Sequence, residues 1–293
     1  MKMQKRKAIV ADQFYPGQHD ACIDQINQCL DMASYNDSVP ETIVAGIVPH
    51  AGWAFSGPLA ALFFSTIRLQ HEKILTFILF GAAHSYFGAL PAIYDRGFWE
   101  TPLGQVAVNE ELAESILNSG LAVSNIQAHQ SEHSIEVQVP FIQYFFPGSK
   151  ILPILVPPRE NAIALGEYTG TIIGQNKSIK SVCVGSTDLT HYGPRYGFTP
   201  MGIGQKALQW SHNVNDKKFI ELALNMESRE LLASAAENGN ACGPGAVAAV
   251  IAAAKKLGSR NGILLGHTNS NEIMLKHSGQ VSTDSVGYAA IIY

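Results

Sequence analysis

The run Ile74–Phe80 reads ILTFILF and passes directly into Gly81-Ala82-Ala83-His84. Seven consecutive apolar or β-branched residues are typical of a strand buried on both faces, as in a parallel sheet covered by helices. The small residues that follow predict a turn in which the backbone can approach a ligand closely. The stretch therefore predicts a buried sheet whose strand end carries a functional histidine.

The same pattern recurs along the chain, because short apolar runs alternate with helix-like segments. The expected strands are Thr42–Val48, Ile74–Phe80, Ile151–Val156, Ile179–Val184, Ile263–Leu265 and Val286–Tyr293. The expected helices are Leu59–Leu69, Glu110–Asn118, Ala162–Ile173, Lys217–Leu224, Ser228–Glu237 and Gly245–Leu257. This alternation predicts an α/β fold: a single three-layer α/β/α domain over residues 1–293 with a mostly parallel or mixed central sheet.

Two details of the sheet are also predicted. Pro153 cannot donate a backbone hydrogen bond, so its strand is expected at an edge of the sheet or the proline at a strand end. A few neighbouring strands, such as Ala89–Tyr94 and Gln105–Val108, are expected to pair antiparallel.

Composition excludes several classes of protein. The 293 residues carry 20 Lys and Arg against 24 Asp and Glu, a net charge of −4, which argues against a nucleic-acid binder. The longest charge-free apolar stretch, Ala246–Ala254, is too short to cross a bilayer, and no secretory signal is recognisable near the first residues. Four scattered cysteines without a CxxC pair fit a reducing compartment. We expect a cytoplasmic protein with neither a nucleic-acid nor a membrane partner.

Three predicted strands end in small-residue turns that carry histidine. Val48 is followed by Pro49-His50-Ala51-Gly52, Phe80 by the turn that ends at His84, and Val184 by GSTDLTH, which contains Asp188 and His191. Ligands of open α/β sheets bind beyond the carboxyl ends of the strands. We therefore expect His50, His84 and His191 to share one crevice, in which histidines with one acid serve as metal ligands or as general bases.

Cys242 is a further candidate, because it lies just before the predicted helix Gly245–Leu257. The positive end of a helix dipole is expected to lower the pKa of this thiol and to favour the thiolate, which binds metals or attacks electrophiles. The alternative is an inert small residue in a turn. The remaining cysteines are expected to be packing residues: Cys22, Cys29 and Cys183.

The motif Glu132-His133-Ser134-Ile135-Glu136 is expected to open another helix, with Glu132 in its first turn. Pro140 must then kink this helix or mark a restart. His133 either reaches the crevice or belongs to a capping region on the surface. The other histidines lie in polar contexts that predict no functional role, although His267 follows the predicted strand Ile263–Leu265.

Several of these motifs, taken together, resemble those of a known family. Pro49–Gly57, PHAGWAFSG, is similar to the PHAGYxYSG element of the Memo family, and Phe80–His84 resembles its LGPSHH element. Further elements follow in family order: Phe14-Tyr15-Pro16 near the start, then Glu132–Glu136, Ser186–Gly193, Cys242-Gly243 and Ser285–Ala290. Each motif alone is weak, but their order over nearly the whole chain is specific.

The resemblance implies a fold similar to class III extradiol dioxygenases, the non-haem iron enzymes that open catechol rings. It implies that His50 and His84 are imidazole ligands of a transition metal and that Cys242 replaces the third, carboxylate ligand. His191 would be the acid/base, with Asp188 beside it, and His133 a residue that contacts substrate or supports a ligand.

The departures from the family pattern bear on the metal. Thiolate is softer than carboxylate and shifts preference from iron toward copper or zinc, so the metal ion is Fe, Cu or Zn. Asp188 supplies the missing carboxylate or only orients a histidine. Ala83 and Ser85 stand where the family has Ser and a second His, so His84 stands alone.

Three functions follow as hypotheses. The first is a metal-dependent oxidoreductase acting on a small aromatic or phenolic ligand, in a pocket lined by Trp53, Phe55 and Tyr192. The second is a non-catalytic binding, signalling or pathway protein that keeps the crevice for a small molecule or peptide. Prokaryotic relatives, named in the AmmeMemoRadiSam set as system protein B, imply a radical-SAM pathway partner. The third is metal-free chemistry with Cys242 as nucleophile and His191 or His50 as base.

Overall fold

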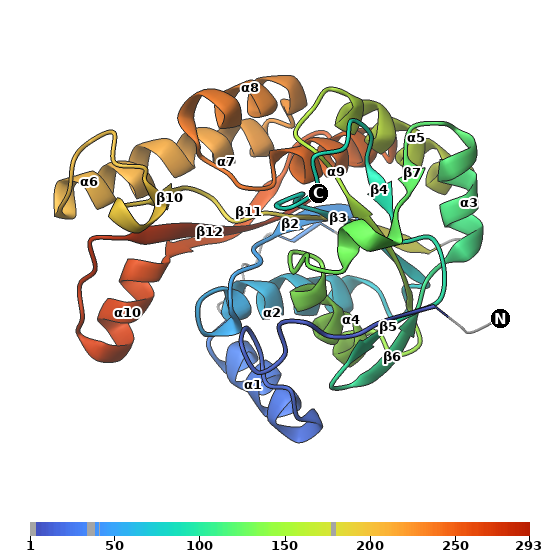
Figure 1. Ribbon diagram of the computed structural model, residues 1–293, viewed down its shortest axis with the longest axis horizontal. Helices are drawn as coiled ribbons and strands as arrows, with labels where there is room; N and C mark the ends of the chain where they lie inside the picture. Colours follow the sequence, from blue (N-terminus) through green and yellow to red (C-terminus); the bar gives the residue numbers. More distant parts are fainter. Residues whose placement is uncertain (1–3, 34–38, 41, 177–179) are drawn as a thin grey trace.

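The computed structural model describes residues 4–33, 39–40, 42–176 and 180–293 (Figure 1). Within them, the large sheet contains β2 (Ala45–Val48), β3 (Thr76–Gly81), β4 (Ala92–Ile93), β7 (Val123–Ser124), β8 (Lys150–Leu155), β9 (Ser181–Ser186), β10 (His191–Tyr192), β11 (Ile263–Asn269) and β12 (Ser285–Ile292). A small sheet contains β1 (Lys5–Arg6), β5 (Phe98–Thr101) and β6 (Gly104–Ala107). The fold is α/β with a mixed sheet, as predicted.

The centre of the large sheet is parallel. Its order is β10-β12-β2-β9-β3-β8-β4-β7, with β11 paired to β12. β2, β9, β3 and β8 run parallel, so the turns that follow β2, β3 and β9 meet at one edge. β12 is antiparallel to β2, and β10 and β11 are antiparallel to β12. This arrangement places the histidine-bearing turns side by side.

Helices cover both faces of the sheet (Figure 1). On one face lie α1, α2 and α4, and on the other α5, α8 and α9. The helices are α1 (His19–Asp31), α2 (Trp53–Gln70), α3 (Glu110–Asn118), α4 (Val139–Phe145), α5 (Asn161–Gln175), α6 (Gln205–Trp210), α7 (Lys217–Leu224), α8 (Ser228–Asn238), α9 (Pro244–Lys256) and α10 (Ser270–Ser278). α9 is alanine-rich, and Pro244 to Ala254 are all buried, which lets it pack against both the sheet and α5.

Of the two detailed predictions about the sheet, one is wrong and the other is right in part. Pro153 is neither in an edge strand nor at a strand end, because β8 lies between β3 and β4. Since β4 ends at Ile93, the missing N–H falls where this short pairing stops, and the Pro153 carbonyl accepts a hydrogen bond from the Tyr94 amide at 3.0 Å. Ala89–Tyr94 and Gln105–Val108 do not pair with each other, but each contains a strand with an antiparallel partner, as predicted. β4 is antiparallel to β8 and parallel to β7, and β6 is antiparallel to β5 in the small sheet.

The segment after Glu132 also differs from its prediction. Glu132 precedes the helices, a short 3-10 turn spans Glu136–Gln138, and α4 begins at Val139. Pro140 therefore stands in the first turn of α4, where its missing N–H is tolerated, and the predicted restart is confirmed. Ile179, the first residue of a predicted strand, lies outside the described residues, and that strand is β9.

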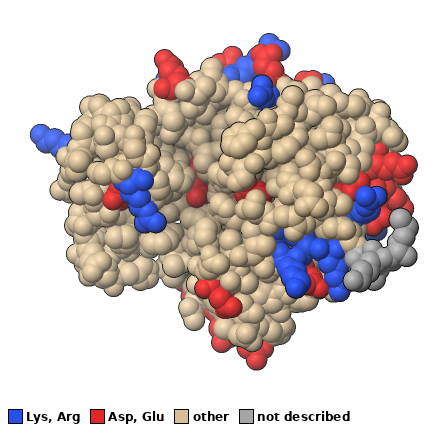
Figure 2. Space-filling model, viewed as in Figure 1, with Lys and Arg blue, Asp and Glu red and all other residues tan. Residues whose placement is uncertain are grey.

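Within the described part of the chain, no helix combines the length and the apolar character needed to cross a membrane. On the face shown in Figure 2, Lys and Arg side chains are scattered around the rim, and acidic side chains are recessed near the middle.

Candidate metal centre

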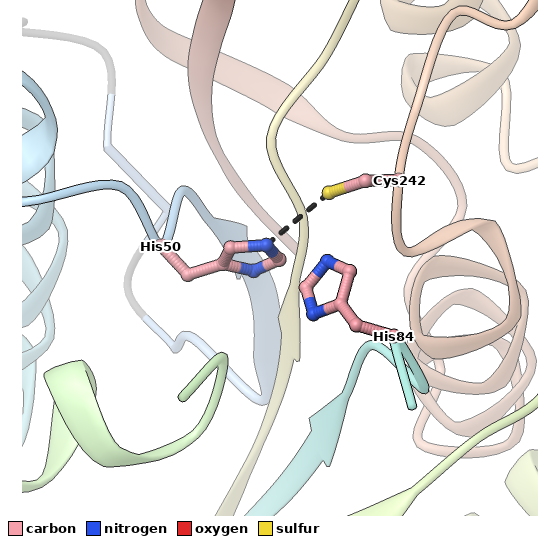
Figure 3. Close-up of side chains that lie close together, drawn as sticks. All are labelled: His50, His84 and Cys242. Carbon is pink, nitrogen blue, oxygen red and sulfur yellow. Dashed lines mark hydrogen bonds between the residues drawn. The ribbon is translucent and has the colours of Figure 1, made fainter. Parts of the chain in front are cut away.

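Three side chains from separate parts of the chain meet beyond the carboxyl ends of the strands (Figure 3). His50 follows β2, His84 follows β3, and Cys242 lies just before α9. Their ligand atoms all lie within 4.8 Å of one another, and the Cys242 Sγ is 3.2 Å from His50 Nε2. The two rings are perpendicular, at 88°, so their in-plane lone pairs can converge. Two imidazoles and one thiolate are a donor set for zinc, copper or iron.

The hydrogen bonds of His50 fix which of its nitrogens is free. Ser186 Oγ donates its only hydrogen to the Ser134 carbonyl at 2.7 Å. It can therefore only accept from His50 Nδ1, which lies 3.0 Å away. Nδ1 then carries the hydrogen, and Nε2 presents its lone pair toward Cys242. Burial also lowers the pKa of His50 well below its usual value, which keeps the ring neutral.

Glu132 fixes His84 in the same way. Its Oε1 accepts from His84 Nδ1 at 3.0 Å, and its Oε2 accepts from the His84 backbone amide at 3.0 Å. Further amides, those of His133 and Ser134, donate to Oε1 at 2.8 Å each. Burial opposes this charge, yet the bonds from His84 and the amides lower the pKa of Glu132 below its usual range. A carboxylate behind a histidine is the usual outer partner of a metal ligand.

Cys242 receives an amide hydrogen bond but has no lowered pKa. The Asp188 amide donates to Sγ at 3.3 Å. Burial raises the pKa of the thiol and outweighs the interaction with His84, so the predicted lowering by the helix is wrong. For His84, burial lowers the pKa, but the bonds to Cys242 and Glu132 outweigh it and raise the pKa to about 10. Without a cation both groups therefore hold a proton at neutral pH, and a bound cation would displace both.

His133 completes the group of rings, as one of its two predicted placements required. It stacks on His84 with centroids 5.0 Å apart and an interplanar angle of 4°, and it meets His50 edge-on at 5.4 Å. Its Nδ1 lies 3.7 Å from Glu132 Oε1. Phe14 packs edge-on against its other side at 4.9 Å. His133 is thus held beside the metal-binding cluster, with a ring fixed by stacking.

Asp188 contacts the cluster, and it lines one cavity together with His191. Asp188 Oδ1 accepts from the His50 amide at 2.7 Å, and burial raises the pKa of this carboxyl to about 6, opposed by the charge of His191. His191 Nδ1 lies 3.1 Å from the Leu189 carbonyl. Because a carbonyl can only accept, Nδ1 carries the hydrogen and Nε2 is the basic nitrogen. The two groups therefore offer a proton acceptor next to a carboxyl.

A cavity of about 340 Å³ adjoins the cluster. Its wall includes the three predicted catalytic residues Asp188, His133 and His191. The rest of the wall combines aromatic and apolar side chains with four polar ones. The larger aromatic and apolar members are Phe14, Phe55, Tyr196, Met274 and Tyr288, and the polar members are Arg195, Ser270, Ser282 and Asp284. The cavity is large enough for a single aromatic ring with substituents.

The predicted pocket lining is only partly right. Phe55 lines the cavity, but Trp53 is 1% exposed, stacks with Tyr15 at 5.1 Å and donates to the Val137 carbonyl. Tyr192 is fully buried in a separate small cluster, where its hydroxyl donates to the Gly202 carbonyl at 2.9 Å. Both rings therefore point into the interior of the protein. The sequence does not show which face of α2 or of β10 is turned toward the cavity.

The other cysteines have surroundings that match the packing role predicted for them. They are buried free thiols in α1 and β9: Cys22, Cys29 and Cys183. Burial raises the pKa of each to about 12, so they stay protonated.

Two residues of the site were missed by sequence reasoning. Glu132 was expected to favour a helix terminus, and Ser186 was part of a motif in which only Asp188 and His191 were singled out. Both act through bonds to histidines that are distant in sequence. The sequence feature that indicates both residues is their position near a candidate histidine. Glu132 is next to His133, and Ser186 is the last residue of the strand that precedes the turn with His191.

The comparisons with known proteins place the chain in a family. A family model described as Memo-like protein matches residues 6–292. A MEMO1 family protein of Methanosarcina barkeri is 34% identical over 292 residues, covering 98% of this chain and 99% of that protein. MEMO1 family proteins of Caldivirga maquilingensis and Pyrococcus furiosus are each 35% identical, with coverage of at least 98% of both chains. This chain therefore belongs to the Memo family.

Proposed function

We propose that this protein is a metal-dependent, dioxygenase-like oxidoreductase that acts on a small aromatic or phenolic ligand. His50, His84 and Cys242 would hold a transition metal. The observation that carries the proposal is the pair of fixed tautomers. Ser186 and Glu132 each engage an Nδ1, so both Nε2 atoms stay available near the Cys242 sulfur.

A metal bound there would supply Lewis-acid and redox chemistry with coordination positions left for a ligand. The chain itself would manage protons. His191 Nε2 is free to take the proton of a phenol in the cavity, and Asp188 stabilises the resulting imidazolium through its charge. His133, which also lines the cavity, would hold the ring of the ligand in position.

The cavity wall supports the class of ligand. Phe14 and Phe55 and the rings of Tyr196 and Tyr288 offer flat apolar surface around the acid/base pair. A ligand with one aromatic ring and a hydroxyl group satisfies both features, because the ring packs on the walls while the hydroxyl meets His191.

The test begins with anaerobic metal loading, elemental analysis and then oxygen uptake with catechols. Opening of a catechol ring with one metal ion held by His50, His84 and Cys242 is the expected result. His191→Gln should keep the metal and lower turnover about 10²- to 10⁴-fold. His277→Gln, on exposed α10, is the matched control. The absence of turnover with Fe, Cu and Zn in turn would overturn the proposal.

A second candidate is a non-catalytic binding or pathway protein that retains the crevice. The thiol favours it, because Cys242 occupies the place of the carboxylate that supports oxygen activation in 2-His-1-carboxylate enzymes. Its ligand would be a small molecule or peptide, and its partner a radical-SAM protein. A metal-loaded protein that binds such a partner and does not consume oxygen would support this function.

Inactivation by iodoacetamide with resistance to chelators would instead favour metal-free thiol chemistry, with Cys242 as the nucleophile.

A further inference from the structure

A second histidine cluster lies beside α10 (lower left in Figure 1), whose Glu272 faces His212 and whose Ser270 and Met274 line the cavity. His212 and Asp216 belong to a π-helical segment, Ser211–Asp216, that joins α6 to α7, and His267 is in β11. One ligand atom from each of the three lies within 4.8 Å of the others. π-Helical turns are rare and occur frequently at functional sites.

The distances in this cluster are those of a long hydrogen bond between His267 and Asp216 and of a looser contact between His212 and Glu272, and both also suit two ligands of one ion. His267 Nε2 lies 3.3 Å from Asp216 Oδ2, and His212 Nε2 lies 3.6 Å from Glu272 Oε1. A charge-assisted N–H···O bond is about 2.7–2.9 Å long. Two ligand atoms at about 2.1 Å from a tetrahedral zinc ion are separated by about 3.4 Å. Both pairs therefore have the separation of neighbouring ligands.

Burial and charge point to a cation at the same place. Asp216 is 1% exposed, and its only ion-pair partner among the described residues is His267. Its Oδ1 accepts from the Thr190 amide at 3.0 Å, which leaves Oδ2 for the cluster. A side chain at Gly287 would collide with this carboxylate, so the glycine is what admits it. A buried carboxylate without a full cationic partner is costly, and a bound cation removes that cost.

We propose that His212, Asp216 and His267 form a second site for a divalent metal ion of the zinc class, with Glu272 at its rim as the fourth ligand. The rings now stack at 4.0 Å with an interplanar angle of 14°. Since imidazole lone pairs lie in the ring plane, one ring must turn to share an ion. His212 can turn, because its side chain is 20% exposed and hydrogen-bonds to Asn269 only at its Nδ1.

The site would be structural rather than catalytic, and it does not depend on the proposed function. It would tie the π-helical segment to β11 and α10. Through Asp216 and Thr190 it would also brace the turn that carries His191. Four protein ligands close the coordination sphere, which is typical of structural zinc.

The test separates the two clusters by mutation. A His50→Ala/His84→Ala/Cys242→Ala variant of the full chain is equilibrated with Zn²⁺, and bound metal is counted. We expect one equivalent to remain and to raise the melting temperature. Adding His212→Gln should abolish both effects, whereas adding His277→Gln on exposed α10 should change neither.

Cobalt gives an independent readout that needs no activity. In the triple variant, Co²⁺ should show the intense visible bands of a tetrahedral site without the ultraviolet band of a cobalt–thiolate bond. Should the triple variant prove unstable, His212→Gln in the otherwise unchanged protein should bind one equivalent fewer than the unchanged protein. A triple variant that folds but binds no zinc, or unchanged stoichiometry in His212→Gln, would overturn the proposal.

Discussion

The two histidine clusters of this protein contain similar residues but present them differently. At His50 and His84 the rings are perpendicular, and outer partners take both Nδ1 atoms. At His212 and His267 the rings are stacked, and carboxylates face both Nε2 atoms. The first cluster is organised for a ligand before one arrives, and the second requires a ring to turn. Which nitrogen is free therefore matters more than how many histidines are present.

The largest effect is expected from removing the sulfur. Cys242→Ala leaves two imidazoles without the anionic ligand, so metal affinity at the first cluster should fall by more than the roughly 100-fold that an outer partner contributes. Competition with a chromophoric chelator measures this. Cys29→Ala, which removes a buried packing thiol, is the control and should leave the affinity unchanged. Equal affinities in the two variants would remove Cys242 from the site.

Glu132→Gln should lower the metal affinity of the first cluster about 10- to 100-fold, because a neutral amide no longer stabilises positive charge on His84. The replacement keeps the size of the side chain and an oxygen that can accept from the amides. Glu100→Gln, whose parent carboxylate pairs with exposed Lys5 at 3.3 Å, is the matched control. Isothermal titration of both variants is the measurement, and equal affinity in both would show that Glu132 serves folding only.

The pH dependence of metal binding should distinguish the clusters. Burial raises the pKa of Cys242, so below that pKa a metal must displace the proton on sulfur. Proton concentration falls tenfold per pH unit, so the proton on sulfur makes affinity at the first cluster rise by about tenfold per unit from pH 6.5 to 8.5. The proton on His84, whose pKa is raised to about 10, adds up to a further tenfold per unit. Burial lowers the pKa of His212, which is already unprotonated in this range, so the second cluster should change less.

These slopes can be measured by repeating the chelator competition at several pH values in the His212→Gln and Cys242→Ala backgrounds. Parallel slopes in the two backgrounds would contradict the assignment of the displaced proton to the thiol.

The smallest effect is expected for Asp216→Asn. The amide oxygen can still accept from Thr190, so the free energy of unfolding should fall by only about 1 kcal/mol. Urea denaturation of the metal-free protein measures this. The second cluster should then lose its metal while the first keeps it. A loss at both clusters would show that Asp216 acts on the whole edge of the sheet.

Much of the fold could be predicted because its signals are local. The run around Phe77 is apolar on both faces, and α9 is bracketed by Pro244 and the lysines at its end. Two-residue strands such as β4 have no such pattern, because they form only where a neighbour supplies partners. The bounds of the π-helical segment are equally invisible, since its residues alternate without an apolar period.

The site was predictable to the extent that it lies at strand ends. The positions of His50, His84 and His191 follow from the parallel order of β2, β9 and β3. The roles of Glu132 and Ser186 do not, because they depend on bonds between residues 48 and 136 positions apart. Burial, likewise, is a property of the folded chain, and it reversed the direction of the pKa shift at Cys242.

The position of β12 has a consequence for how the molecule forms. Residues 285–292 lie in the interior of the sheet, where they pair with β2, β10 and β11. The backbone of Ala45 exchanges hydrogen bonds with Tyr293, so this pairing can form only after some 250 further residues have been synthesised. Such distant pairing slows folding and leaves apolar surface open during synthesis. A ribosome-bound chain that lacks this strand would expose one edge of β2, and that unpaired edge is the kind of surface to which chaperones bind.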